Sequence, residues 1–160
     1  MNKFVLLIRL VHRAENKVAS DMLAIGERHK TDHEIYHLTH DFARWSRRHV
    51  DLLAEAGQRH GAELDHADDD SSWLRPVREK ASELFGRRPE TGLVLLRDLR
   101  ELHLDLVGLS VDWEILAQAA QGVKDSDLLD VAQTCHPETL RQARWTNAMI
   151  KVISPQVIAS

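Results

Sequence analysis

The sequence predicts an all-α protein: an up-down four-helix bundle with one long crossover between its second and third helices. Leu, Ala, Arg and Glu are plentiful, whereas the 160 residues include only 7 Gly and 4 Pro, a composition that favours helices. Four segments carry apolar residues at alternating steps of three and four, the spacing of a stripe that faces a bundle core. Because this length is typical of one domain, we expect residues 1–160 to form a single unit.

The first two predicted helices cover residues 3–29 and 33–60. The stripe of the first helix is Phe4, Ile8, Val11, Glu15, Val18, Met22, Ile25 and His29. The stripe of the second helix is Ile35, Leu38, Phe42, Trp45, His49, Leu52 and Ala56. If the first stripe continued, it would pass through Asp32 and miss Ile35, so a short turn separates the two helices and makes them antiparallel neighbours. Thr31 and Glu34 have the spacing of a capping box at the start of the second helix.

Residues 61–90 form the predicted crossover. Gly61 ends the second helix, and an acidic, turn-like stretch follows it. We expect a short helix from Pro76 to Phe85 and an anchoring role for Trp73. The crossover is long enough to run the length of the bundle. It can therefore return the chain to the other end of the bundle, so that helices one and four run one way and helices two and three the other. If it does not return, the third and fourth helices each run in the opposite direction to this.

The last two predicted helices cover residues 91–121 and 126–153, with Gly122 closing the third helix and Asp125 or Ser126 capping the fourth. The third stripe is apolar throughout: Leu95, Leu99, Leu102, Leu106, Leu109, Trp113, Leu116 and Ala120. The fourth stripe is Leu129, Ala132, His136, Leu140, Ala143, Asn147 and Ile150. Because proline lacks a backbone N–H and disfavours helical geometry before it, Pro137 predicts a kink or break at Cys135–His136.

Charged residues beside the third and fourth stripes predict how these helices pack. Asp98, Glu101 and Asp105 form an acidic row, and Arg141 and Arg144 form a basic row. Antiparallel packing about residue 123 would place Glu101 opposite Arg144 and Asp105 opposite Arg141. Exposed pairs of this kind contribute little stability, so they indicate register more than energy.

Three ionisable residues within the stripes point to chemistry: Glu15, His49 and His136. A buried carboxylate is costly without a partner. At about 1.5 Å of rise per residue, the three fall at nearly the same height if the crossover returns, and less closely so if it does not. Asp112 then lies roughly one turn away on the third helix. Two histidines and a carboxylate suit iron, manganese or zinc, so we predict one metal ion held by Glu15, His49 and His136, with Asp112 nearby.

The same residues have a second interpretation without a metal. Glu15 can form a buried hydrogen-bonded layer with His49 or His136, and such layers can specify register in helical bundles. The protein would then be a structural or protein-interaction module. We expect a homo-oligomer, such as a homodimer.

The arrangement resembles the ferritin-like superfamily, whose di-iron members carry Glu on helices one and three and Glu-x-x-His on helices two and four. Glu15 matches the first-helix Glu, and His49 and His136 match the two histidines. The other carboxylates are missing: Ser46 and Gln133 begin the two Glu-x-x-His positions, and Leu109 occupies the third-helix position. The resemblance thus implies a divergent member with an incomplete di-iron motif, binding one metal or none.

Several function classes are not expected. The net charge of −4, without a basic cluster, argues against nucleic-acid binding, and no apolar stretch is long enough to span a bilayer. Arg9 interrupts the apolar N-terminal run, and the single cysteine excludes an intrachain disulfide, so we expect a cytoplasmic protein. Cys135 is interpreted as a small buried residue. The chain has no phosphate-binding loop, nucleophile elbow or paired-cysteine motif, and no substrate is predicted. Enzyme activity is left open: with an open coordination position on the metal held by Glu15, His49 and His136, the protein would be an oxidoreductase.

Overall fold

The computed structural model describes residues 2–67 and 90–160, and this part of the chain contains four long helices and no strand. The helices are α1 (Lys3–Arg28), α2 (His33–Arg59), α4 (Thr91–Val123) and α5 (Ser126–Ile158). The all-α class is confirmed. The predicted helix at Pro76–Phe85 and the predicted anchor Trp73 lie outside the described residues. Among the described helices, none combines the length and the apolar character that crossing a membrane requires.

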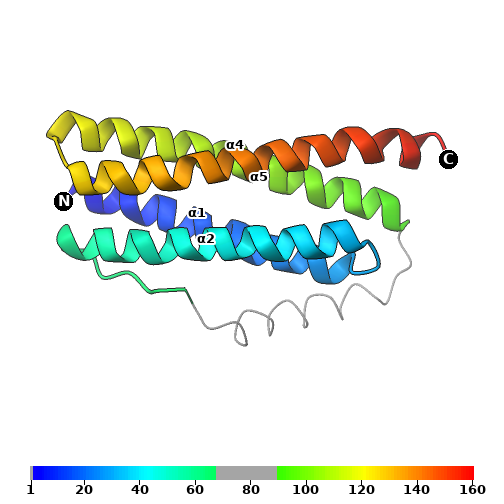
Figure 1. Cartoon of the computed structure of the whole chain (residues 1–160), viewed down its shortest axis with the longest axis horizontal. Helices are drawn as coiled ribbons and strands as arrows, with labels where there is room; N and C mark the ends of the chain where they lie inside the picture. Colours follow the sequence, from blue (N-terminus) through cyan, green and yellow to red (C-terminus); the bar gives the residue numbers. More distant parts are fainter. Residues whose placement is uncertain (1, 68–89) are drawn as a thin grey trace.

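The helices form two antiparallel hairpins, α1–α2 and α4–α5, that lie side by side (Figure 1). At one end His60, which follows α2, bonds to Asp125 in the α4–α5 turn at 2.7 Å. At the other end Arg28 and His29, which end α1, bond to Asp98 near the start of α4. The chain therefore leaves α2 at one end of the molecule and enters α4 at the other. In Figure 1, α1 and α5 run in one direction and α2 and α4 in the opposite one.

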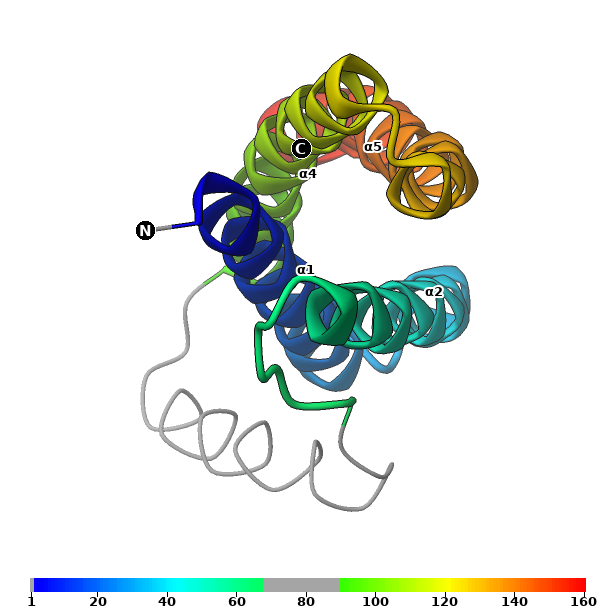
Figure 2. The same cartoon turned by 90° about the vertical axis from the view of Figure 1, so that its left-hand side faces the viewer.

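The core is built mainly from the stripes of α1 and α4. Every residue of the predicted α4 stripe is buried, and so is every residue of the α1 stripe except Phe4. In α2, the stripe residues Leu38, Trp45 and Leu52 are only half-buried. Among the neighbouring helix pairs, α2 and α5 contact each other least, and Figure 2 shows them farthest apart on the open side of the bundle. Side chains that point toward this seam consequently keep part of their exposure.

The predicted stripe of α5 is displaced from the buried one. Leu140 is exposed, and His136, Asn147 and Ile150 are only partly buried. Ala143 is buried as predicted, and the other buried residues follow a regular pattern of fours and threes: Leu128, Ala132, Cys135, Thr139, Gln142, Thr146, Met149 and Ile153. Most of them lie one position before the predicted residue.

Polar residues explain why this stripe was missed. The hydroxyls of Thr139 and Thr146 donate to backbone carbonyls one turn earlier, at 3.3 and 2.8 Å. The Gln142 amide donates to the Phe42 carbonyl and to Ser46 Oγ on α2, at 3.0 and 3.1 Å. Because these hydroxyl and amide N–H donors are bonded in place, they can be buried at little cost.

A kink or break was predicted at Cys135–His136, and the break is wrong. α5 continues through Pro137 and Pro155 and ends at Ile158, five residues beyond the predicted end at 153. An interior proline removes one helical hydrogen bond, but Cys135 and Thr139 on either side of Pro137 are fully buried. Tertiary packing therefore outweighs the local preference.

The helix caps correct two smaller predictions. Asp32, and not Thr31, caps α2, because its side chain accepts a bond from the backbone N–H three residues on, at 3.2 Å. α4 passes Gly122 and ends where Lys124 adopts a left-handed conformation with φ 60°. Asp125 caps α5, as predicted.

Two residues of the acidic row of α4, Asp98 and Asp105, pair with residues of the α1 segment. Asp98 bonds to Arg28 at 3.1 Å and to His29 at 2.8 Å, and Asp105 bonds to Lys17 at 2.5 Å. These two carboxylates thus join the two hairpins to each other. The predicted position of Asp105 opposite Arg141 on the fourth helix is therefore wrong as an ion pair, because Asp105 pairs with Lys17.

Candidate functional site

Glu15 lies in the middle of the α1 stripe and is fully buried, with 0% of its surface exposed. The Nδ1–H of His49 on α2 donates to Glu15 Oε1 at 2.8 Å. The indole N–H of Trp113 on α4 donates to the same oxygen, also at 2.8 Å. Three helices therefore meet at one carboxylate oxygen, and the expected contact between Glu15 and His49 is present.

Trp113 was predicted only as a core residue. A buried indole N–H requires an acceptor, and Glu15 is the buried acceptor at its height. This need for an acceptor, considered for the first and third stripes together, could have predicted the pairing of Trp113 with Glu15.

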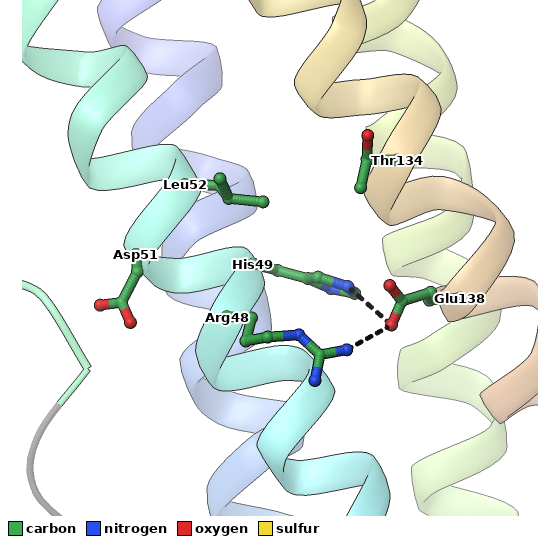
Figure 3. Close-up of a pocket in the computed structure, with 6 residues that line it drawn as sticks. All are labelled: Arg48, His49, Asp51, Leu52, Thr134 and Glu138. Carbon is green, nitrogen blue, oxygen red and sulfur yellow. Dashed lines mark hydrogen bonds and ion pairs between the residues drawn. The ribbon is translucent and has the colours of Figure 1, made fainter.

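The second nitrogen of His49 points away from Glu15 toward α5. His49 is 1% exposed, and its Nε2 has no hydrogen-bond partner among the described residues. Glu138 Oε2 lies 3.6 Å from it, too far for a hydrogen bond. Arg48 Nη2 contacts the same Glu138 oxygen at 3.1 Å. Figure 3 shows His49 and Arg48 both extending from α2 toward Glu138.

A pocket of about 230 Å³ opens between α2 and α5 at this point (Figure 3). It is lined by Arg48, His49, Asp51, Leu52, Thr134 and Glu138. This volume accommodates a hydrated ion or a small molecule. The buried His49 therefore connects a buried carboxylate on α1 with a carboxylate that borders an open pocket.

Other buried polar atoms lie near this layer. Glu15 Oε2 and Gln142 Oε1 have no hydrogen-bond partner in the described part of the chain. Cys135 is fully buried, as predicted. Burial raises the pKa of the Cys135 thiol, and the negative charges of Glu15 and Glu138 raise it further. The sulfur is therefore a neutral thiol and a poor metal ligand or nucleophile.

His136 and Asp112 are placed elsewhere. His136 is half-buried, and its Nε2 lies 3.0 Å from Ser110 Oγ at the α4–α5 interface. The phase of α5 explains this position, because Cys135 takes the inward place that the predicted stripe assigned to His136. Asp112 is partly buried, which raises its pKa above the ordinary value.

The structure thus brings together Glu15 and His49 from the predicted metal set, and it places Glu138 next to them. Neither His136 nor Asp112 has a described hydrogen bond or ion pair with either of the first two. Within residues 2–67 and 90–160, no group of three or more His, Cys, Asp and Glu side chains is arranged to hold a metal ion. Glu138 was not predicted, because it lies off both the predicted and the observed stripe of α5.

A comparison with protein-family models, curated proteins and solved structures found no match for this chain.

Proposed function

We propose that this protein binds one divalent transition-metal ion in the pocket between α2 and α5. The side-chain ligands are His49, through Nε2, and Glu138, through its carboxylate. Glu15 orients His49 from the protein interior. The unpartnered, buried Nε2 of His49 at the edge of this pocket carries the proposal.

The hydrogen bond between Glu15 and His49 supports this role. A histidine that binds a metal through one ring nitrogen usually donates its other N–H to a carboxylate or carbonyl. With Nδ1–H donated to Glu15, the neutral imidazole carries its lone pair on Nε2, the nitrogen nearest the pocket. Such a partner fixes the orientation of the ring and raises its basicity as a ligand.

The donor set indicates which metals fit. Imidazole nitrogen and carboxylate oxygen together suit zinc, iron and manganese, the ions predicted from the sequence. Two ligand atoms bound to one ion at about 2.1 Å lie roughly 3 to 3.5 Å apart, and Nε2 and Glu138 Oε2 are 3.6 Å apart. With only two protein ligands, the other coordination positions would be taken by water or by a small molecule.

Arg48 opposes the ion, because its guanidinium occupies the same Glu138 oxygen. Its side chain is 59% exposed, so it can turn into solvent when a cation binds. We therefore expect modest affinity, and we expect Arg48→Ala to bind metal more tightly than the wild type.

Metal titration of protein purified without an affinity tag tests the proposal. Calorimetry with Zn²⁺ and visible absorption with Co²⁺ should both report one site. His49→Ala and Glu138→Gln should each weaken binding by at least about tenfold, and Glu15→Gln should weaken it by about 10 to 100-fold.

His136→Ala is the matched control. Because His136 bonds to Ser110 and not to the pocket, its removal should leave the affinity unchanged. If His136→Ala abolishes binding while Glu138→Gln does not, the ligand set first predicted from the sequence is the correct one. If the wild-type protein binds neither metal, the proposal is wrong.

A metal-free module is the second candidate, and one observation favours it. Glu15 Oε1 already accepts bonds from His49 and Trp113, so this part of the layer is complete without an ion. Glu15 and His49 would then specify how α1, α2 and α4 pack. This candidate predicts that a chelator leaves the thermal unfolding midpoint unchanged, whereas a bound metal predicts a lower midpoint with chelator.

Finer features of the fold belong to the same proposal. We infer a divergent ferritin-like, up-down bundle, supported by the long connection between α2 and α4 and by the helix directions in Figure 1. We also infer a kink of α5 at Pro137, supported by the backbone hydrogen bond that proline cannot donate.

A further inference from the structure

The outward side of α4 carries an unusual concentration of apolar surface. Six of the eleven large apolar side chains that are exposed in the described residues lie on this one helix. Leu104, Val107, Val111 and Ile115 follow one another at helical spacing, with 44 to 53% of each side chain exposed. We call these four residues the α4 ridge.

The α4 ridge points away from the rest of the bundle. α4 contacts α1 through Asp105 and Trp113, and it contacts α5 through Ser110. In Figure 2, α4 lies between α1 and α5, and none of the described helices covers its remaining side. Gly108 sits beside the ridge, and a Cβ added there would meet no atom within 4 Å, so the surface is open to close approach.

An apolar row on both sides of one helix is uncommon in a monomer. A helix at a bundle surface normally has one apolar stripe and one polar face. Contiguous exposed apolar patches usually mark a surface that another molecule covers. α4 has a fully buried leucine stripe and, on the opposite side, the ridge.

We propose that the α4 ridge binds the same ridge of a second copy of this chain, with the two α4 helices antiparallel about Val107. The charges beside the ridge select this partner and this direction. Arg100 lies seven residues before Val107 and Glu114 seven residues after it, and both are exposed. A twofold axis at Val107 brings Arg100 of each copy to the height of Glu114 of the other.

The position of the two charges around the helix agrees with this register. At 3.6 residues per turn, Arg100 and Glu114 both lie toward the same edge of the ridge, and in an antiparallel pair equivalent edges face each other. On the other edge of the ridge, Glu101 follows Arg97 by one helical turn. These two opposite charges lie close together within one chain, so neither needs a partner on the second copy. Arg100 and Glu114 therefore favour an antiparallel pair, because in a parallel pair these two equivalent edges would lie on opposite sides of the interface and the two charges would not meet.

Sedimentation velocity of the full chain over a range of concentrations tests the dimer. We expect a reversible monomer–dimer equilibrium, with or without chelator, because the ridge is remote from the α2–α5 pocket. Val111→Glu should raise the dimer dissociation constant by about tenfold or more while the helical circular dichroism stays unchanged. Leu140→Glu is the control, since Leu140 is an exposed apolar residue of α5 and should leave the dimer intact.

Charge reversal tests the register. Arg100→Glu and Glu114→Arg should each weaken the dimer, and the double variant should restore it. Two single cysteines test the direction: Val107→Cys, on the proposed axis, should form a disulfide-linked dimer on oxidation. Leu93→Cys should not, because its two copies would lie about 40 Å apart at 1.5 Å per residue.

Three results would overturn the proposal: a monomer at every concentration, a dimer insensitive to Val111→Glu, or crosslinking of Leu93→Cys as fast as that of Val107→Cys. Binding of the wild-type chain to lipid vesicles without self-association would overturn it too. None of these outcomes depends on whether a metal binds at His49.

Discussion

Two buried carboxylates have partners of different kinds. Glu15 accepts bonds from an imidazole and an indole, whereas Asp98 pairs with the guanidinium of Arg28 and with His29. Burial alone would raise the pKa of Asp98, but these partners and Arg97 hold it below its ordinary value. Asp98 therefore ties the start of α4 to the end of α1 as an ionised group.

Stability should depend on pH through Asp98. Because its folded-state pKa lies below its unfolded value of about 3.9, the stabilisation is complete above that pH and is lost as the pH falls through the folded pKa. Asp98→Asn should lower the free energy of unfolding by about 1.5 to 3 kcal/mol at neutral pH. Urea denaturation at several pH values should show this difference shrinking below about pH 4.

Glu101→Gln provides the control, since Glu101 is exposed on the same helix and should change stability by less than about 0.5 kcal/mol. A difference for Asp98→Asn that stays constant down to pH 2 would contradict the assignment.

At the scale of single elements, α5 departs most from its sequence pattern. Its buried face includes Thr139, Gln142 and Thr146, and its interior includes Pro137. Each feature is unfavourable for an isolated amphipathic helix. The neighbouring helices compensate for them by burying the threonines and by accepting the Gln142 amide.

Replacing the interior proline should strengthen the helix. Pro137 is exposed, so Pro137→Ala adds a backbone hydrogen bond without disturbing the core. Alanine also increases the freedom of the unfolded chain, which offsets part of the gain. We expect the free energy of unfolding to rise by about 1 to 2 kcal/mol, as measured by urea denaturation. Pro155→Ala, near the end of α5, should change it less, and equal effects would argue against this explanation.

At the scale of the whole molecule, the two hairpins are joined unequally. The α1–α4 side combines two apolar stripes with the bonds of Glu15, Asp98 and Asp105. The α2–α5 side contains the pocket and partly exposed aromatic and aliphatic residues. The bundle should therefore open more readily at the α2–α5 seam, where a ligand would enter.

Hydrogen exchange can measure this difference. Amides of α2 and α5 beside the pocket should exchange at least about tenfold faster than those of α4 between Leu102 and Trp113, because local opening costs less there. Mass spectrometry of exchanged protein resolves the four helices. Equal protection of all four would mean that the seam is as stable as the rest of the bundle.

Sequence periodicity was sufficient for much of the fold. Helix starts were predicted at 3, 33, 91 and 126, and all four agree with the structure. The stripes of the first and third helices are almost purely apolar, and both are buried as predicted, apart from Phe4. Where a helix has a nearly apolar stripe, the stripe and the local helix signals predict the same buried face and the same helix.

The site was predictable only in part, for a reason that lies in α5. Glu15 and His49 could be paired because each interrupts an apolar stripe at a matching height. His136 could not be placed, because the buried face of α5 contains two threonines and a glutamine. In the sequence alone, such polar residues are typical of an exposed face. A shift of one residue turns a helix by about 100°, which separated His136 from the layer and brought Glu138 toward the pocket.

The sequence by itself determined the four helices, their order and the polar interruption at Glu15, because these depend on composition and on spacing within one helix. Only the tertiary structure decided which end of the bundle the crossover reaches, which face of α5 is buried and which side chains meet His49. Those features depend on contacts between residues far apart in the chain, where a polar group is buried or exposed according to the partner it finds.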